Sequence, residues 1–125
     1  MIRVIIADDS LVIRERLTDM LSELDGVELV GQAEDAIEAR SLAERLKPDV
    51  AILDVRMPGG SGVDVLHDIK RRNPDTKVIM LTAYPHPEVR SRCVQGGADY
   101  FLEKSTEFTR VAPILDRLSH SRGPE

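Results

Sequence analysis

Short runs of apolar residues, without the alternation of a half-exposed strand, recur along the chain and predict buried strands. The run over residues 50–53, VAIL, is followed by Asp54 and by a loop that contains Pro58. Four consecutive apolar residues suit a strand covered on both faces, as in a parallel sheet between helices. A buried helix segment could show the same run, but the β-branched residues and the flanking proline and glycines favour a strand. By the same reasoning, strands are expected over residues 3–7, 27–33, 77–81 and 100–103, with residues 27–33, which alternate more, nearer a sheet edge.

Between these runs, apolar residues recur at intervals of three and four, which predicts amphipathic helices with one face toward the core. Ser10 and Asp35 stand where they can cap the first two helices, and Ser61 or Gly62 opens the third. Pro87 suits the first position of a fourth helix. The apolar face of that helix is thin and comprises Val89, Cys93 and Val94. A helix attached to the core by so few residues is a candidate for one that shifts.

The last helical segment contains Pro113, which would kink a helix if it lay deep inside. We therefore expect a separate turn over residues 106–109 and a main helix that starts near Arg110, so that the proline falls in its first turn. Five strands that alternate with five helical segments predict an α/β fold, a doubly wound parallel sheet with helices on both faces. The domain is expected over residues 1–120, with residues 121–125 as a tail or linker stub.

Composition excludes several classes of protein. The 125 residues carry a net charge of −5 and include two Tyr, two Phe and no Trp, which argues against a general nucleic-acid binder or a base-stacking surface. No apolar run approaches the roughly 20 residues of a membrane helix, and acids come too early in the chain for a secretion signal. The single cysteine, Cys93, excludes an internal disulfide and a cysteine-built zinc site, and is expected to be a packing residue. We expect a cytoplasmic protein that contacts neither nucleic acid nor membrane directly.

Polar side chains stand at the carboxyl ends of the predicted strands. Asp8 and Asp9 follow the first strand, Asp54 the third, Thr82 ends the fourth and Lys104 follows the fifth. The carboxyl ends of parallel strands meet at one edge of the sheet, where open α/β folds place their sites. Asp54 is therefore expected to be presented at this edge rather than buried. Three carboxylates so close would repel one another unless a cation lay among them, and oxygen ligands suit Mg²⁺.

This set of groups is typical of phosphoryl transfer. A carboxylate can attack phosphorus and form an acyl phosphate, while a metal, Lys104 and Thr82 neutralise and hydrogen-bond the phosphoryl oxygens. Ala83 is small and leaves room for the phosphate. Each group alone has an ordinary explanation, since Asp8 and Asp9 could cap a helix and Lys104 could be a solvated charge. These groups indicate a phosphoryl-transfer site only when they are taken together.

With these residues in place, the chain resembles the receiver domain of bacterial two-component response regulators over about residues 2–120. The resemblance rests on Asp8-Asp9, Asp54 with Met57-Pro58 and Gly62 behind it, Thr82-Ala83 and Lys104, in that order and spacing. It implies a flavodoxin-like sheet with strand order 2-1-3-4-5. It also implies that Asp54 accepts a phosphoryl group from the histidine of a sensor histidine kinase, and that Mg²⁺ is held by Asp8, Asp9, Asp54 and the backbone carbonyl of Arg56.

The resemblance further implies a switch. The hydroxyl of Thr82 and the aromatic ring of Phe101 would move together when the phosphate arrives. The face formed by the fourth helix, the fifth strand and the last helix would then change partners, which allows a homodimer through this face. The output would be that of a single-domain relay or of the receiver of a transcriptional regulator.

The chain departs from the family pattern at a few positions near the site. Ser105 follows Lys104 where the family usually has proline after a cis peptide bond; because a cis bond before a non-proline costs about 3 kcal/mol, this bond is expected to be either strained or trans. Phe101 replaces the commoner tyrosine and has no hydroxyl. Arg56 and Tyr84 occupy two variable positions that, in this family, tune hydrolysis of the aspartyl phosphate, and their bulk could shield it from water.

Two other functions compete with a phosphorylation switch. A Mg²⁺-dependent phosphohydrolase with an aspartyl-phosphate intermediate commonly has its nucleophile and general acid two residues apart on one strand, but Asp8 and Asp9 are adjacent and no second acid flanks Asp54. An interaction module that is never phosphorylated would not need the complete set of acids and Lys104.

Two remaining groups of polar residues carry no expected role in the site. The three histidines have no ligand-like spacing and are expected in surface or loop positions; they are His67, His86 and His120. Lys70, Arg71 and Arg72 are expected at the solvated end of the third helix, where positive charge suits the helix dipole.

Overall fold

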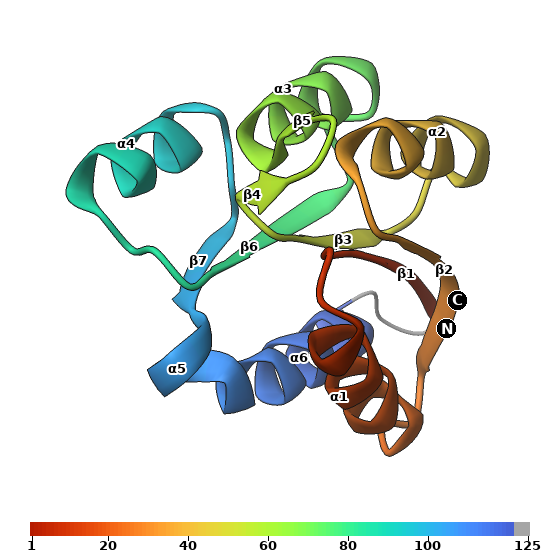
Figure 1. The fold of residues 1–125 in the computed structure, drawn as a ribbon. Helices are drawn as coiled ribbons and strands as arrows, with labels where there is room; N and C mark the ends of the chain where they lie inside the picture. Colours follow the sequence, from red (N-terminus) through yellow and green to blue (C-terminus); the bar gives the residue numbers. More distant parts are fainter. Residues whose placement is uncertain (122–125) are drawn as a thin grey trace.

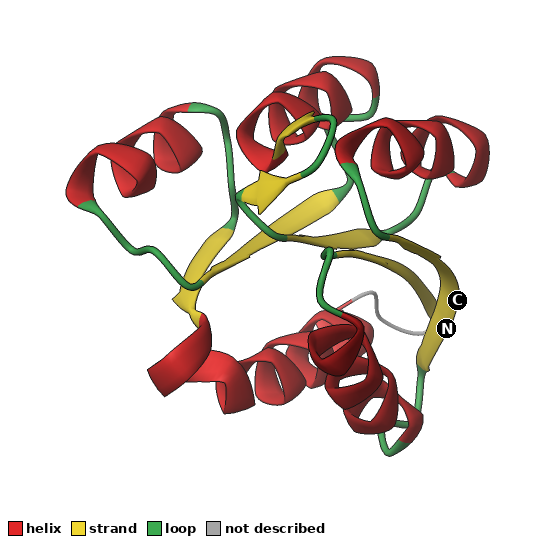
Figure 2. Ribbon diagram, in the orientation of Figure 1, coloured by secondary structure: helices red, strands yellow, loops and turns green. Residues whose placement is uncertain are grey.

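The computed structural model describes residues 1–121 and contains a five-stranded parallel sheet (Figures 1 and 2). The strands lie in the order β2-β1-β3-β6-β7, which confirms the expected order of the five long strands. Their bounds are β1 Ile2–Ala7, β2 Val27–Ala33, β3 Val50–Leu53, β6 Lys77–Thr82 and β7 Tyr100–Glu103. The tail expected over residues 121–125 lies outside the described residues except for Ser121, which ends the last helix.

Helices cover both faces of this sheet, with α2, α3 and α4 on one face and α1 and α6 on the other (Figure 1). Their bounds are α1 Leu11–Ser22, α2 Ala36–Leu46, α3 Gly62–Arg72, α4 Pro87–Gln95, α5 Lys104–Glu107 and α6 Val111–Ser121. Two hydrophobic clusters fill the spaces between the sheet and its helical layers. Successive residues of β3 alternate between them, because Ala51 and Leu53 belong to one cluster and Val50 and Ile52 to the other. All four residues of β3 are buried, as the unbroken apolar run predicts.

The expected caps hold the helix starts. The side chains of Ser10, Asp35 and Ser61 accept hydrogen bonds from backbone N–H groups in the first turns of α1, α2 and α3. Pro87 opens α4 as expected, but the expectation for Val94 is wrong, since this side chain is 58% exposed. Cys93 is the one buried residue of α4, so this helix is held to the core more weakly than its neighbours.

The segment after β7 differs from the sequence expectation in where its first turn begins. The turn starts at Lys104 instead of residue 106, and it continues through a 3₁₀ turn over Phe108–Arg110. The earlier start is explained by Glu103, whose backbone N–H donates to the Glu107 carboxylate and whose own carboxylate accepts from the Ser105 and Thr106 hydroxyls. The main helix α6 begins at Val111, which confirms that Pro113 lies in a first turn.

A short antiparallel hairpin was not foreseen in the loop after Asp54. It consists of β4 Arg56–Met57 and β5 Gly60–Ser61. The backbone N–H of Ala36 donates to the Pro58 carbonyl at 2.9 Å and attaches the hairpin to the start of α2. Strands of two residues fall below the length at which apolar periodicity can be recognised, so the pattern predicts only a loop here.

Lys70 is not solvated, contrary to the sequence expectation. Its ammonium donates to the Thr76 carbonyl at 2.7 Å and to Asp99 Oδ2 at 2.8 Å, and the same oxygen accepts from the Val78 N–H. The Lys70 side chain is 17% exposed. The contact therefore joins the end of α3 to the starts of β6 and β7.

Replacing Lys70 with methionine is expected to lower the free energy of unfolding by about 1–2 kcal/mol, because Asp99, whose side chain is 24% exposed, would keep only the more distant Lys77 ammonium at 3.9 Å as a charged partner among the described residues. Arg71→Met is the matched control, since the Arg71–Asp68 pair lies on the surface with the arginine 74% exposed, and we expect a change below about 0.5 kcal/mol. Urea unfolding of both variants measures the two values. Equal losses would show that Lys70 has no special structural role.

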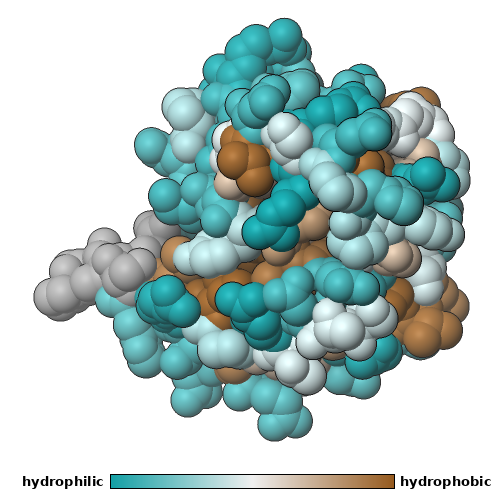
Figure 3. All heavy atoms as spheres, turned by 90° about the vertical axis from the view of Figure 1, so that its left-hand side faces the viewer, coloured by the Kyte–Doolittle hydropathy of each residue, from teal (hydrophilic) through white to brown (hydrophobic). Residues whose placement is uncertain are grey.

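Across the described residues, no helix is both long and apolar enough to span a membrane. The side of the molecule that carries α4, β7 and α5, on the left in Figure 1, is mostly hydrophilic, with hydrophobic residues visible between the two helical layers (Figure 3).

Candidate functional site

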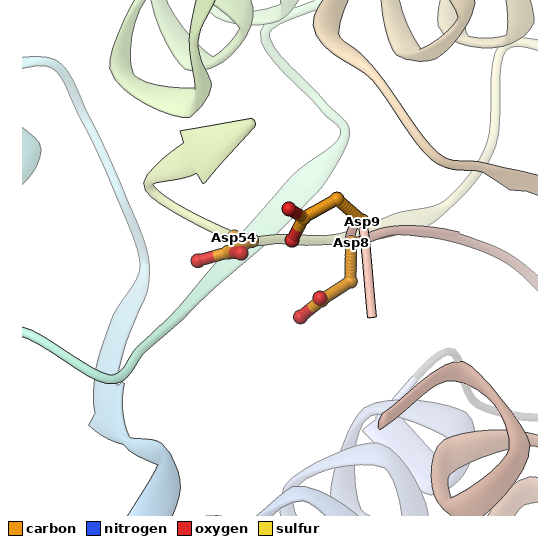
Figure 4. Close-up of side chains that lie close together, drawn as sticks. All are labelled: Asp8, Asp9 and Asp54. Atoms are coloured by element: carbon orange, nitrogen blue, oxygen red, sulfur yellow. The ribbon is translucent and has the colours of Figure 1, made fainter. Parts of the chain in front are cut away.

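Three carboxylates meet at the carboxyl edge of the sheet, as the sequence predicts. The parallel register pairs Ala7 of β1 with Leu53 of β3, so the residues that follow these strands lie side by side. Each of Asp8, Asp9 and Asp54 offers a carboxylate oxygen, and these oxygens lie within 4.8 Å of one another (Figure 4). Oxygen donors at this spacing suit a hard cation that keeps several waters, which is the chemistry of Mg²⁺.

Asp54 is less accessible than expected. It lies at the sheet edge, yet it is only 6% exposed, and Asp8 is 2% exposed, whereas Asp9 is open to solvent. The Lys104 ammonium lies against both buried acids, 2.6 Å from Asp8 Oδ2 and 3.3 Å from Asp54 Oδ2. Lys104 follows the edge strand β7, and from there its ammonium contacts two of the three acids.

The peptide bond between Lys104 and Ser105 is trans, one of the two outcomes expected for a lysine not followed by proline. With this bond trans, the Lys104 ammonium still reaches two of the acids. The substitution of serine at position 105 therefore leaves the lysine directed into the site.

The pKa values in the site reflect burial and charge. Burial, followed by repulsion from Asp8, raises the pKa of Asp54 to about 6, against opposing contributions from Lys104 and the Arg56 N–H. Burial by itself would lower the pKa of Lys104, but its contacts with Asp8 and Asp54 outweigh it and raise that pKa above the ordinary value. Lys104 is therefore charged at neutral pH, and a divalent cation among the acids would favour the ionised form of Asp54.

Backbone groups orient the two buried acids. The N–H of Ser10 donates to Asp8 Oδ1 at 2.9 Å, and the N–H of Arg56 lies 3.4 Å from Asp54 Oδ1. The Asp54 N–H donates to the Ala7 carbonyl at 2.9 Å, which continues the ladder between β1 and β3 past the strand ends. The sheet therefore fixes the backbone of Asp54, and the turns that follow β1 and β3 orient the two buried carboxylates.

Thr82 and its neighbours form another side of the site. Thr82 ends β6 and is fully buried, and its hydroxyl oxygen accepts from the Tyr84 N–H at 3.0 Å, which leaves the hydroxyl proton able to donate elsewhere. Ala83 is exposed, consistent with an open approach past this strand end. The Arg56 guanidinium lies 4.5 Å from the centroid of the Tyr84 ring, so the two residues bridge the loops after β3 and β6.

Phe101 lies within β7 rather than among the acids. It pairs with Met80 in the parallel register and packs, partly buried, against the hydrophobic cluster beneath α2, α3 and α4. The Arg90 guanidinium of α4 lies 5.3 Å from the centroid of its ring. A cation over the ring face is a contact that a phenylalanine can make without a hydroxyl.

One residue near the acids was missed in the sequence. Arg14 of α1 donates from Nη1 to the backbone carbonyl of Asp8 at 2.7 Å, and its side chain is 13% exposed. An arginine in the second turn of an amphipathic helix carries no sequence signal for such a contact, because surface arginines are common there.

Comparison with known proteins places this arrangement in context. Residues 4–116 match the family model described as the response regulator receiver domain. The chain is 38% identical over 115 residues to response regulator GacA from Pseudomonas viridiflava, an alignment that covers 92% of this chain and 54% of that protein. The chain thus spans about half the length of that relative.

Solved structures agree with the fold. The response regulator domain of Thermotoga maritima CheB is 32% identical, with a TM-score of 0.82 and coverage of 97% of this chain and 95% of that one. A CheX–CheY complex with BeF₃ and Mg²⁺ from Borrelia burgdorferi contains a chain that is 25% identical, with a TM-score of 0.80 and coverage of 91% and 89%. On the sheet order, the acids at the strand ends and these matches, the chain belongs to the response regulator receiver domain family, the signalling domain of two-component systems.

Proposed function

We propose that this receiver is switched by transfer of a phosphoryl group from the histidine of a sensor histidine kinase to Asp54. The observation that carries the proposal is the convergence of three carboxylates and one ammonium on a single sheet edge. Asp8, Asp9, Asp54 and the backbone carbonyl of Arg56 would hold Mg²⁺, and the presence of Mg²⁺ in the similar CheX–CheY complex supports a magnesium site in this fold. Bound there, Mg²⁺ would neutralise phosphoryl oxygens and the charge of the acids.

In the proposed reaction, an Asp54 carboxylate oxygen forms a bond to phosphorus while the bond from phosphorus to the donor imidazole nitrogen breaks. Lys104 already lies within 3.3 Å of Asp54 and would balance negative charge on the phosphoryl group. The Thr82 hydroxyl would donate its proton in a hydrogen bond to a phosphoryl oxygen, since its oxygen is engaged by the Tyr84 N–H. Exposed Ala83 would leave the entry path open.

The signal would leave through the face formed by α4, β7 and the segment from α5 to α6. The weak attachment of α4, with Cys93 as its one buried residue, and the contact of Arg90 with Phe101 support a rearrangement there. This face would form a homodimer or meet an output domain, so that the receiver acts as a relay or controls transcription.

Intact-mass spectrometry after incubation with acetyl phosphate tests the proposal. We expect one added phosphoryl group per chain with Mg²⁺ and none with a chelator or in Asp54→Asn. An adduct that persists in Asp54→Asn would contradict the assignment of the acceptor. Repeated turnover of a phosphomonoester would instead indicate a phosphohydrolase.

The contact between Arg56 and Tyr84 is expected to slow loss of the phosphoryl group by keeping water from it. A cation–π contact at an exposed site contributes about 0.5–1 kcal/mol, which corresponds to about a two- to fivefold change in rate. Arg56→Ala and Tyr84→Ala should therefore each dephosphorylate faster by about this factor. The double variant should be little faster than either single one, because each removes the same contact. Unchanged rates in both single variants would show that the pair does not shield the site.

A further inference from the structure

Arg14 donates a hydrogen bond to the backbone carbonyl that lies between two of the acids. The carbonyl of Asp8 belongs to the peptide unit that joins Asp8 to Asp9. The 2.7 Å bond from Arg14 Nη1 therefore restrains the orientation of this peptide plane. A charge-assisted bond to a carbonyl is among the stronger hydrogen bonds in proteins. The Arg14 side chain is only 13% exposed, so little water competes for this bond.

The other contacts of this turn show what Arg14 adds. The Asp8 N–H donates to the Ala33 carbonyl, and the Asp8 side chain is held by the Ser10 N–H and by Lys104. The side chain of Asp9 is exposed and projects from the far end of the same peptide unit (Figure 4). The direction of Asp9 relative to Asp8 therefore depends on the orientation of the peptide that Arg14 holds.

We propose that Arg14 is a positioning residue for the metal site, which sets the relative directions of the Asp8 and Asp9 carboxylates through the carbonyl between them. The inference rests on the proposed binding of Mg²⁺ by these acids. For the effect of removing Arg14 on Mg²⁺ affinity, this positioning role predicts the opposite of what charge alone predicts. Removal of a positive charge near a cation site should strengthen cation binding, whereas loss of a positioning contact should weaken it.

Arg16 provides a matched control on the same helix. It lies two residues further along α1, is exposed, and places its guanidinium 4.1 Å from the centroid of the Phe108 ring instead of at the acids. Arg14→Gln and Arg16→Gln remove the same charge from the same helix. The difference between them reports the contacts of Arg14, which are the hydrogen bond to the Asp8 carbonyl at 2.7 Å and an ion pair at 4.0 Å with the exposed Glu34 carboxylate. A pair at that distance with an exposed partner contributes little, so the hydrogen bond dominates the comparison.

The experiment is calorimetric titration of Mg²⁺ into the unaltered chain, Arg14→Gln, Arg14→Lys and Arg16→Gln. We expect Arg14→Gln to weaken binding about tenfold, the usual size of an effect from a residue that orients metal ligands. Arg14→Lys keeps the charge but not the planar fork, and should bind between Arg14→Gln and the unaltered chain. Arg16→Gln should bind as the unaltered chain does or slightly more tightly.

A second readout needs no metal. The nuclear magnetic resonance signal of the Asp9 amide, which belongs to the same peptide unit, should shift in Arg14→Gln without Mg²⁺ and stay in place in Arg16→Gln. If Arg14→Gln binds Mg²⁺ as tightly as Arg16→Gln, the positioning role is wrong and the proposed function stands. If the unaltered chain binds no Mg²⁺, both the positioning role and the proposed metal site are wrong.

Discussion

Replacing Gly62 with alanine is expected to lower the free energy of unfolding by about 3 kcal/mol. A Cβ at this position would come to 1.8 Å from the Asp54 carbonyl oxygen, a backbone atom that cannot move without displacing the end of β3. Helix propensity alone predicts the opposite sign, because alanine is a better helix former than glycine. The sign of the change in the free energy of unfolding therefore shows whether the steric contact with the Asp54 carbonyl or helix propensity dominates at position 62.

Gly31→Ala is the matched control for this substitution. Its added Cβ would meet the Leu46 and Leu42 side-chain methyl groups at 3.2–3.3 Å, and such ends of flexible side chains can yield. We expect a change below about 1 kcal/mol for Gly31→Ala in the same urea titration. A variant Gly62→Ala as stable as the native chain would show that α3 can move away from Asp54 at little cost.

Replacing Asp54 with asparagine is expected to stabilise the chain above about pH 6 when a chelator is present. The pKa of Asp54 rises from 3.8 to about 6 on folding, chiefly because of burial. The folded state therefore binds the proton more tightly than the unfolded state, and stability falls as the pH rises between these two values. A shift of about two pH units corresponds to about 3 kcal/mol, an upper bound for the gain in Asp54→Asn at neutral pH.

The pH dependence makes this prediction specific. The gain should be about 1–3 kcal/mol near pH 7.5 and should shrink toward zero near pH 4, where the native carboxyl is also protonated. Asp64→Asn, at an exposed position in the first turn of α3, should change stability by less than about 0.5 kcal/mol at either pH. Added Mg²⁺ should reduce the difference in stability between Asp54→Asn and the native chain, because Mg²⁺ binding stabilises the native chain more than Asp54→Asn. A loss of stability in Asp54→Asn near pH 7.5 would contradict the account of burial and repulsion.

Much of the fold and of the site could be predicted, for reasons that particular residues make clear. The run over residues 50–53 is buried on both faces and sits in the middle of a parallel sheet, so its apolar character is unambiguous. Because such strands end at a common edge, the convergence of Asp8, Asp9 and Asp54 follows from their positions after the strands. Lys104 joins them by the same argument.

Features that depend on long side chains or on exact backbone paths could not be predicted. Lys70 and Arg14 are long cations on helices, and whether they face solvent or fold back to a carbonyl is decided by tertiary packing. Val94 lies on the expected apolar face of α4, but this helix contacts the core through so few residues that its orientation is weakly specified. The low exposure of Asp54 likewise depends on how neighbouring side chains pack at the sheet edge.

The requirement for glycine at position 62 also depends on the exact backbone path. Its sequence position is part of the family resemblance, but only the approach of its Cα to the Asp54 carbonyl explains why a side chain is excluded. This contact links the start of α3 to the proposed phosphoacceptor.

The measurement that tests the central claim most directly is to locate the phosphoryl group on a single residue. The chain would be phosphorylated with acetyl phosphate and Mg²⁺, and the acyl phosphate reduced with borohydride, which converts a phosphorylated aspartate to homoserine. Peptide mass spectrometry should then find homoserine at position 54 and unaltered aspartate at Asp8 and Asp9. Homoserine at position 8 or 9, or none in a chain shown to carry the phosphoryl group, would contradict the assignment of Asp54 as the acceptor.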